Sequence, residues 1–303
     1  MKNTRTIGYI LCVLATISFC HIFIFSKKAM ETSTLEQFCL YWFGFSFILN
    51  GFTMRLTNSR KNIKTIIIHN YKVLIVLGVL EIIISTMLFS AIHFIPNAAV
   101  SGMLGNLFPI FTAIFGVTLL KEKLYKKEYI GLVAAFVGIL ITSFPDNMVI
   151  SDLLNKGTVL MVGHCLIAAF ETILIKTKIN KIPPLVLNTN RAIFLLIYAI
   201  CSMFYTNTPW AISIETLKNI AIGAFIGPFL AINLVYYSLK YMDASRATVI
   251  QSSKGLVLIL CTYLYWGEVP KLYQVLGGVT TLLGLVYMTW VEVRMKRLEL
   301  KIK

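Results

Sequence analysis

The sequence predicts an all-α integral membrane protein with ten transmembrane helices in two inverted five-helix repeats. Ten mostly apolar stretches fill nearly all of the 303 residues. Each is about long enough to cross a bilayer as a helix, and the cations between them fall mainly on alternate sides. Charged residues make up only 14% of the chain, and the mean hydropathy is +0.78. Soluble domains carry about 25% charged residues, so the composition argues against one large soluble core.

The first half of the chain holds five predicted spans. The first span follows a charged lead, as a signal peptide does, but its apolar run is too long and lacks a small-x-small cleavage site, so we expect an uncleaved helix. The longest link, Thr57–Lys72, follows the second span. Pro109 should bend the fourth span, and Gly131 and Gly138 should let the fifth pack closely. These spans are 7–27, 36–56, 73–92, 98–119 and 128–145.

The second half holds the other five predicted spans. The sixth and seventh each carry one charged residue in mid-helix, Glu171 and Arg191. Gly227-Pro228 should bend the eighth span, and the ninth carries Lys254. The tenth has glycines seven residues apart, as the fifth does. These spans are 157–178, 185–205, 217–238, 245–266 and 272–292.

The distribution of cations predicts the orientation. With the N-terminus inside, 21 of the 28 Lys and Arg residues fall in inner segments, five in outer loops and two within spans. Cytoplasmic loops carry the excess of positive charge in membrane proteins. We therefore expect both termini to be cytoplasmic.

The chain also repeats itself at a shift of 146 residues. Five spans per copy is an odd number, so the second copy must enter the membrane inverted, which is a recurrent arrangement in secondary transporters. The predicted repeats are residues 1–150 and 151–303. The matching pairs are Ala98 with Ala244, Glu122 with Glu268, Gly131 with Gly277 and Gly138 with Gly284.

At the ends of these repeats the chain resembles the drug/metabolite transporter superfamily, specifically its EamA-type ten-helix family. The resemblance covers about the whole length. It rests on the two repeats and on AIHFIPNAAVSGMLGNLFPIF with KEKLYKKEYIG, and SLKYMDASRATVIQSSKGLVL with GEVPKLYQVLG. Lys121-Glu122 departs from the family's Gly-Glu turn, and Lys254-Gly255 from its acidic-proline pair. The resemblance implies alternating access and transport of small metabolites, often amino acids, without ATP.

Four charged residues lie within predicted spans, where a central charge costs about 2.5–3.5 kcal/mol. Glu81 lies roughly 12 Å and Lys254 roughly 13–14 Å from the inner edge of the bilayer, at about 1.5 Å per residue. Glu171 and Arg191 each lie roughly 9 Å from that edge. Opposite charges at similar depths predict two pairs, Glu81 with Lys254 and Glu171 with Arg191.

Both pairs have two interpretations. A cation and an anion in one cavity could hold the carboxylate and the amine of a zwitterionic substrate. A permanent pair would instead lock two helices together, and Arg191 could extend to the cytoplasmic face.

Two polar residues add to the predicted substrate site. Asn106 lies near the same depth in the fourth span, and Gln251 precedes Lys254 by one helical turn. Either could instead cap a bent helix. A buried carboxyl or a histidine could carry a coupling proton. The candidates for that role are Glu81, Glu171 and His21.

The leading hypothesis is a secondary transporter for a small polar or zwitterionic metabolite, an amino acid or a derivative, working by export or ion-coupled exchange. The alternative in the same superfamily is transport of a lipid-linked or nucleotide-linked sugar. Its phosphate would suit Lys254 and Arg191 but not Glu81 and Glu171. An integral membrane enzyme is disfavoured, because the sequence has no HExxH, GxSxG or Walker motif.

Composition bounds the partners. The net charge of +15 could suggest nucleic-acid binding, but the cations sit in short loops beside apolar spans rather than on a soluble basic face. All six cysteines lie in spans without a CxxC pair, so we expect no metal and no cofactor. The expected partners are the lipid bilayer, a small-molecule substrate and a coupling proton, with the chain a monomer or a homodimer. The Lys- and Ile-rich usage is typical of an AT-rich bacterial genome, which favours the cytoplasmic (inner) membrane.

Overall fold

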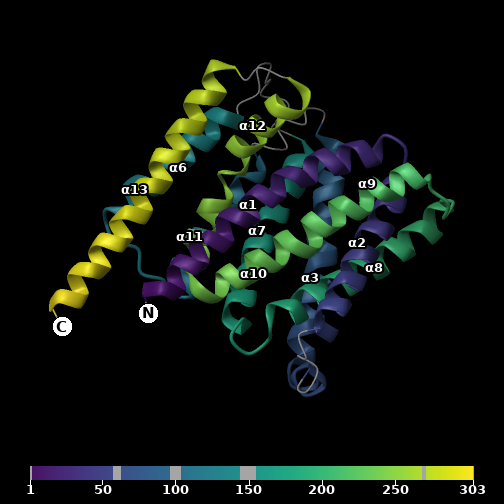
Figure 1. Cartoon of the computed structure of the whole chain (residues 1–303), viewed down its shortest axis with the longest axis horizontal. Coiled ribbons are helices and arrows are strands. Elements are labelled where there is room, and N and C mark those ends of the chain that lie inside the picture. The colour runs from purple at the N-terminus through teal and green to yellow at the C-terminus, as the bar shows by residue number, and fades with distance from the viewer. Residues whose placement is uncertain (1, 57–62, 96–103, 144–154, 268–270, 303) are drawn as a thin grey trace. The chain divides into compact units, whose positions relative to one another are not determined.

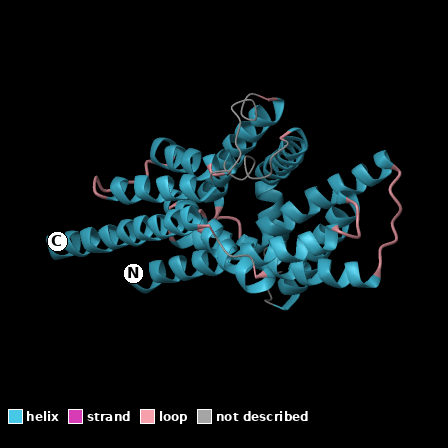
Figure 2. Ribbon diagram, turned by 90° about the horizontal axis from the view of Figure 1, so that it is seen from above, coloured by secondary structure: helices cyan, strands magenta, loops and turns pink. Residues whose placement is uncertain are grey.

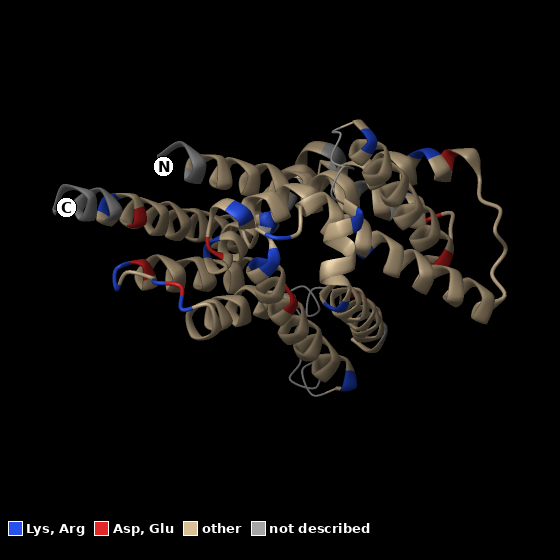
Figure 3. Cartoon of the chain, turned by 90° about the horizontal axis from the view of Figure 1, so that it is seen from below, with Lys and Arg blue, Asp and Glu red and all other residues tan. Residues whose placement is uncertain are grey.

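The computed structural model describes residues 2–56, 63–95, 104–143, 155–267 and 271–302, and none of these lies in a strand (Figures 1 and 2). The all-α prediction is therefore confirmed. Five described helices are long and apolar enough to cross a membrane, and three shorter apolar helices accompany them. Figure 3 shows that long stretches of these helices carry no charged residue.

All ten predicted spans contain helix. The first five correspond to α1 (Lys2–Met30), α2 (Leu35–Leu56), α3 (Ile63–Phe94), α5 (Leu107–Leu119) and α6 (Glu128–Ser143). The sixth and seventh are α7 (Lys156–Lys178) and α8 (Pro184–Thr206). The eighth is formed by α9 (Ile214–Ala224), the π-helical η3 (Phe225–Ala231) and α10 (Ile232–Tyr241). The last two are α11 (Ala244–Gln251) with α12 (Lys254–Trp266), and α13 (Leu272–Ile302).

Two of the described helices extend ten residues beyond the predicted spans at one end. Helix α3 begins at Ile63 rather than at residue 73, and α13 continues to Ile302 rather than ending at 292. The added segments are rich in Ile, Lys, Arg, Glu and Leu, most of which are good helix formers. Hydropathy predicts the part of a helix that lies in lipid. Helix propensity favours continuing the helix beyond that part, so the observed helices are longer than the predicted spans.

The chain folds into two compact units, and each draws on both halves of the sequence. Unit 1 comprises Met1–Thr86 and Leu174–Met242, and unit 2 comprises Met87–Ile173 and Asp243–Lys303. The division at residue 150 therefore remains a prediction about repeats in the sequence and is not a boundary between compact units.

In unit 1, α1 packs along α9, η3 and α10, and α2 packs on α8 and α9 (Figure 1). Glycines permit the close approaches. A Cβ on Gly8 would lie 3.0 Å from Cβ of Tyr241, and one on Gly227 would lie 2.7 Å from the Ile22 side chain.

In unit 2, α6 and α13 pack along their length, and α11 packs on α5. The glycines predicted to allow close packing lie at the first of these contacts. A Cβ on Gly131 would lie 2.6 Å from the Gly284 carbonyl oxygen, and one on Gly138 would lie 2.5 Å from that of Gly277. The prediction of glycine-mediated packing is confirmed for these four positions.

Three spans are interrupted. Pro228 lies inside η3. Its missing N–H and its ring disturb the α-helical hydrogen bonds, which accounts for the interruption of the eighth span there. The fourth span is interrupted at Asn106, which precedes α5 and Pro109. The ninth is divided at Ser252 and Ser253, a break that sequence analysis did not predict.

Candidate functional site

Glu81 on α3 and Arg191 on α8 form an ion pair within unit 1. Arg191 Nε donates to Glu81 Oε1 over 2.6 Å, and the guanidinium carbon lies 5.8 Å from the centre of the Phe43 ring. The Glu81 side chain is 9% exposed and that of Arg191 is 20% exposed. The predicted pairing was wrong: the partner of Glu81 is Arg191 and not Lys254. Depth along a helix says nothing about which helices are neighbours.

This pair has the chemistry of a zwitterion site. Guanidinium groups bind carboxylates in a planar, two-pronged geometry, and carboxylates accept hydrogen bonds from ammonium groups. A fifth of the Arg191 side chain remains exposed although Glu81 is nearly covered. The cationic side of the pair is therefore the more accessible one.

Lys254 lies in unit 2, where the ninth span is broken. It is the first residue of α12, and its side chain is exposed. Gln251 ends α11, and its side-chain nitrogen donates to the Ala247 carbonyl oxygen of its own helix over 3.3 Å. A cation thus stands at a helix N-terminus, where the backbone N–H groups also favour negative charge.

Asn106 marks the corresponding break in the fourth span. Because Pro109 has no N–H, the Gly105 carbonyl loses its helical donor, and the Cys165 thiol on α7 lies 3.6 Å from that oxygen. The break in the fourth span therefore has a polar neighbour on α7.

Glu171 and His21 stay as predicted candidates for a coupling proton. Glu171 on α7 is buried, with 6% of its surface exposed. Arg191, which was predicted to pair with Glu171, bonds Glu81. His21 on α1 places Nδ1 3.0 Å from the Ile17 carbonyl oxygen of the same helix.

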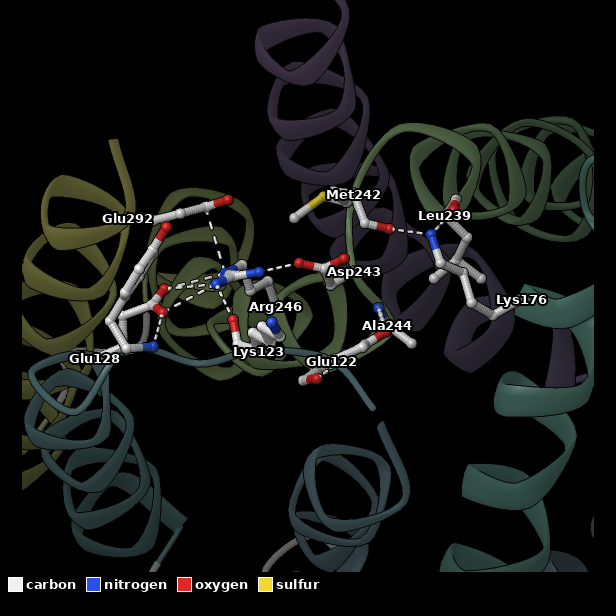
Figure 4. A network of polar contacts seen from close by, with 12 residues as sticks. Glu122, Lys123, Glu128, Lys176, Leu239, Met242, Asp243, Ala244, Arg246 and Glu292 are labelled. Carbon is white, nitrogen blue, oxygen red and sulfur yellow. Dashed lines mark hydrogen bonds and ion pairs between the residues drawn. The ribbon is translucent and has the colours of Figure 1, made fainter. Parts of the chain in front are cut away.

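Sequence analysis missed a buried charge cluster in unit 2, shown in Figure 4. Arg246 is 2% exposed and donates to both carboxylate oxygens of Glu128, over 2.9 and 3.0 Å. It also pairs with Asp243, lies 3.4 Å from Glu292 and donates to the Lys123 carbonyl oxygen over 3.2 Å. In the sequence, Arg246 is counted only as one of the cations of the inner segments. Its partners on α6 and α13 are far away in the chain, so the sequence does not indicate the cluster.

Glu122 binds the N-terminus of α11. Its Oε1 accepts from the Ala244 backbone N–H over 2.8 Å, and its Oε2 from the Ser245 N–H over 3.1 Å and from the Ser245 hydroxyl. The repeat relates Glu122 to Glu268 and Ala244 to Ala98, and it carries no signal for a contact between Glu122 and Ala244. Their counterparts, Glu268 and Ala98, lie outside the described residues.

Comparisons with known proteins agree with this architecture. The sequence matches the EamA-like transporter family over residues 6–144 and again over 155–290. It is similar over 95% of its length to a solved structure titled "Crystal structure of protein", with a TM-score of 0.76, 15% identity and 98% of that chain covered. That likeness shows the fold alone.

Two curated relatives carry transporter names. One is an uncharacterized transporter of Archaeoglobus fulgidus, 25% identical over 62% of this chain and 67% of that protein. The other is an uncharacterized transporter of Synechocystis sp., 26% identical over 61% of this chain. The second match spans 55% of the relative's own length.

Proposed function

Because the chain belongs to the EamA-like transporter family, we propose that it is a secondary transporter that moves a small zwitterionic metabolite, an amino acid or a derivative, by alternating access. Transporters of this kind bind substrate between repeats and need no ATP. The family and the relatives' names point to a transporter and not to an enzyme.

The observation that carries the substrate class is the Glu81–Arg191 pair. Two opposite charges 2.6 Å apart on apolar helices match the two charges of an amino acid. The substrate carboxylate would bind the Arg191 guanidinium in place of Glu81. The substrate ammonium group would bind the Glu81 carboxylate. Ionisable groups within membrane helices are expensive, which makes a functional role the default hypothesis for them.

Lys254 supports the same proposal from unit 2. Its ammonium group and the N-terminus of α12 both favour a substrate carboxylate, and Asn106 and Gln251 each lie at a helix break. Discontinuous helices whose N-termini face anionic groups are the recurring binding device of secondary transporters. We assign these residues to substrate binding at a different step from Arg191.

A charge swap tests whether the ion pair binds substrate or only joins two helices. In Glu81→Arg/Arg191→Glu the pair can re-form, so a structural role predicts recovered folding and recovered transport. Our proposal predicts recovered folding without transport. In the swapped variant the cation and the anion exchange places, so they no longer match the carboxylate and the ammonium group of the bound substrate. Each single variant, Glu81→Gln and Arg191→Gln, should lose exchange of labelled amino acids in reconstituted vesicles.

The matched control is the exposed pair of Lys28 and Glu215, whose charged atoms lie 4.0 Å apart. Swapping these two should leave exchange unchanged, because exposed pairs contribute about 0–1 kcal/mol. Full exchange by the Glu81/Arg191 swap would contradict the proposal.

A second candidate is transport of a phosphate-bearing sugar, which the exposed Lys254 at the N-terminus of α12 favours, since helix N-termini bind phosphate. A melting-temperature screen in detergent separates the two. Stabilisation by amino acids supports the zwitterion proposal, and stabilisation only by nucleotide-linked sugars supports the alternative.

Proton coupling and membrane placement belong to the same proposal. We assign the coupling proton to Glu171, since Glu81 is bonded to Arg191, and keep His21 as a second carrier. The cation distribution supports both termini inside, and the Lys- and Ile-rich usage favours a cytoplasmic (inner) membrane.

A further inference from the structure

Three asparagines form a buried cluster in unit 1 that is separate from the ion pair. Asn50 on α2 and Asn188 on α8 are fully buried, and Asn233 on α10 is 8% exposed. Asn233 Nδ2 donates to Asn50 Oδ1 over 2.9 Å, and Asn188 Nδ2 lies 3.4 Å from the same oxygen. The three carboxamides therefore meet at Asn50.

The π-helical segment fixes the direction of these carboxamides. Asn188 Nδ2 donates to the Pro228 carbonyl oxygen over 2.9 Å, and Asn233 Nδ2 to that of Phe229 over 2.7 Å. Backbone carbonyls in an interrupted helix need donors, and these side-chain nitrogens supply them. The nitrogen ends are thus committed, so the oxygen ends of both carboxamides must point elsewhere.

Two of the amide oxygens are left without a donor. Within the part of the chain that the structure describes, neither Asn188 Oδ1 nor Asn233 Oδ1 has a hydrogen-bond partner, although both are buried. An unsatisfied buried acceptor costs about 1–3 kcal/mol. Because the two ends of a carboxamide are a little over 2 Å apart, each oxygen lies within roughly 6 Å of Asn50 Oδ1.

The chemistry of the unsatisfied atoms limits what can bind. They are neutral oxygens, which accept hydrogen bonds and do not donate them, so the ligand must be a cation or a hydrogen-bond donor. Amide and backbone carbonyl oxygens are ligands of hard cations, and divalent ions in proteins are usually held by carboxylates as well. Arg191, one turn from Asn188 on α8, is neutralised by Glu81. A monovalent ion fits this environment best.

We propose that the Oδ1 atoms of Asn188 and Asn233, in side chains that Asn50 orients, bind a monovalent alkali-metal cation beside the π-helix, with water completing its coordination. The cation would join α8 and α10 and relieve the two unsatisfied oxygens. This ion site is independent of the substrate class proposed above.

The test is the melting temperature of the full chain in detergent while choline chloride is replaced by NaCl or KCl at constant ionic strength. A ligand that binds only the folded state raises the melting temperature in a saturable way. We expect a rise of a few degrees with one of the two alkali ions and none with choline. Equal melting temperatures in all three salts would overturn the proposal.

Variants locate the effect. Asn188→Ala and Asn233→Ala should lose the ion-dependent rise, whatever they do to the melting temperature in choline. The matched control is Asn190→Ala, two residues along α8, whose amide donates to the Leu74 carbonyl oxygen outside the cluster. It should keep the rise. An ion-dependent rise that survives in both cluster variants would place the ion elsewhere and contradict the site.

Asn233→Asp keeps the shape of the side chain and adds a negative charge. If it folds, it should saturate at a lower ion concentration than the wild type, and an unchanged saturation point would count against direct coordination. Amino-acid exchange measured in choline chloride separates the two proposals. Exchange without any ion effect overturns the ion site alone, and an ion effect without exchange overturns the proposed substrate alone.

Discussion

Arg246 is a cation whose charge is met by carboxylates from three segments of unit 2. Removing a guanidinium and its partners from water costs several kcal/mol per ion. Bonds to both oxygens of Glu128, with Asp243 and Glu292 alongside, offset that cost. The cluster holds α6, α11 and α13 together through one side chain.

Truncating Arg246 should therefore destabilise the protein strongly. Arg246→Ala leaves buried carboxylates without their cation, and breaking a buried pair from one side costs about 3–5 kcal/mol. We expect a clearly lower melting temperature in detergent. Arg294→Ala is the control, because that exposed guanidinium lies over the Trp290 ring, a contact worth about 0.5–1 kcal/mol. Equal effects of the two substitutions would contradict a structural role for the cluster.

Glu171 carries the prediction about coupling. If its buried carboxyl transfers the proton, Glu171→Gln should abolish uptake driven by a pH gradient and retain exchange of substrate across the membrane, because a neutral amide cannot titrate. Both assays use the same reconstituted vesicles. Glu215→Gln, on an exposed side chain, should retain both activities. Gradient-driven uptake by Glu171→Gln would remove the residue from the coupling path.

The charged residues themselves could be predicted from sequence, because a charge within an apolar span is conspicuous. Their partners could not. Glu81 and Arg191 are 110 positions apart, and depth along a helix leaves the rotation of each helix and the identity of its neighbours open. The three asparagines were missed for a related reason, since a single buried amide has no pattern in sequence.

At the scale of elements, the α6–α13 contact depends on glycine. Gly131 and Gly284 approach so closely that a Cβ on either would lie 2.6 Å from the other's carbonyl oxygen. Backbone atoms meet there, so no flexible side chain can move aside. Glycine spacing in the two helices predicted this close packing, because seven residues return to nearly the same face of a helix.

A methyl group at this contact should separate the two helices. Overpacking costs about 1–3 kcal/mol, so Gly131→Ala and Gly284→Ala should each lower the melting temperature. Gly51→Ala on α2 is the control, because nothing lies within 4 Å of a Cβ at that position. Alanine is favoured over glycine in helices by up to about 1 kcal/mol, so this control should be neutral or stabilising. Unchanged melting of both α6–α13 variants would contradict the close contact.

Helix breaks were predicted where proline causes them and missed where it does not. Pro228 and Pro109 signal the interruptions at η3 and Asn106 through the missing N–H. Nothing of this kind marks Ser252 and Ser253, where the backbone stays near right-handed helical angles. The substrate proposal relies on that second break, since it places Lys254 at a helix N-terminus.

At the scale of the whole molecule, the glycine contacts are reciprocal. Gly131 meets Gly284 and Gly138 meets Gly277, while a shift of 146 residues relates Gly131 to Gly277 and Gly138 to Gly284. Each position thus contacts the counterpart of the other, as in a two-fold interface. The helices run antiparallel at this contact, which is what two repeats of opposite orientation require.

This symmetry makes each half dependent on the other. In unit 2, α6 comes from the first half and α13 from the second, and in unit 1, α2 and α8 are divided in the same way. We therefore expect that a copy of the second half cannot replace the first, because the predicted repeats would enter the membrane in opposite orientations.

Residues 1–150 or 151–303 expressed alone should therefore give no cooperative melting transition, whereas co-expression of the two pieces should restore it and restore exchange in vesicles. The full chain is the reference for both measurements. Gly284→Leu in the second piece should prevent the two pieces from purifying together, because the larger side chain blocks the α6–α13 contact. A cooperative transition from either piece alone would show that a single half folds by itself and that the shared units are not required.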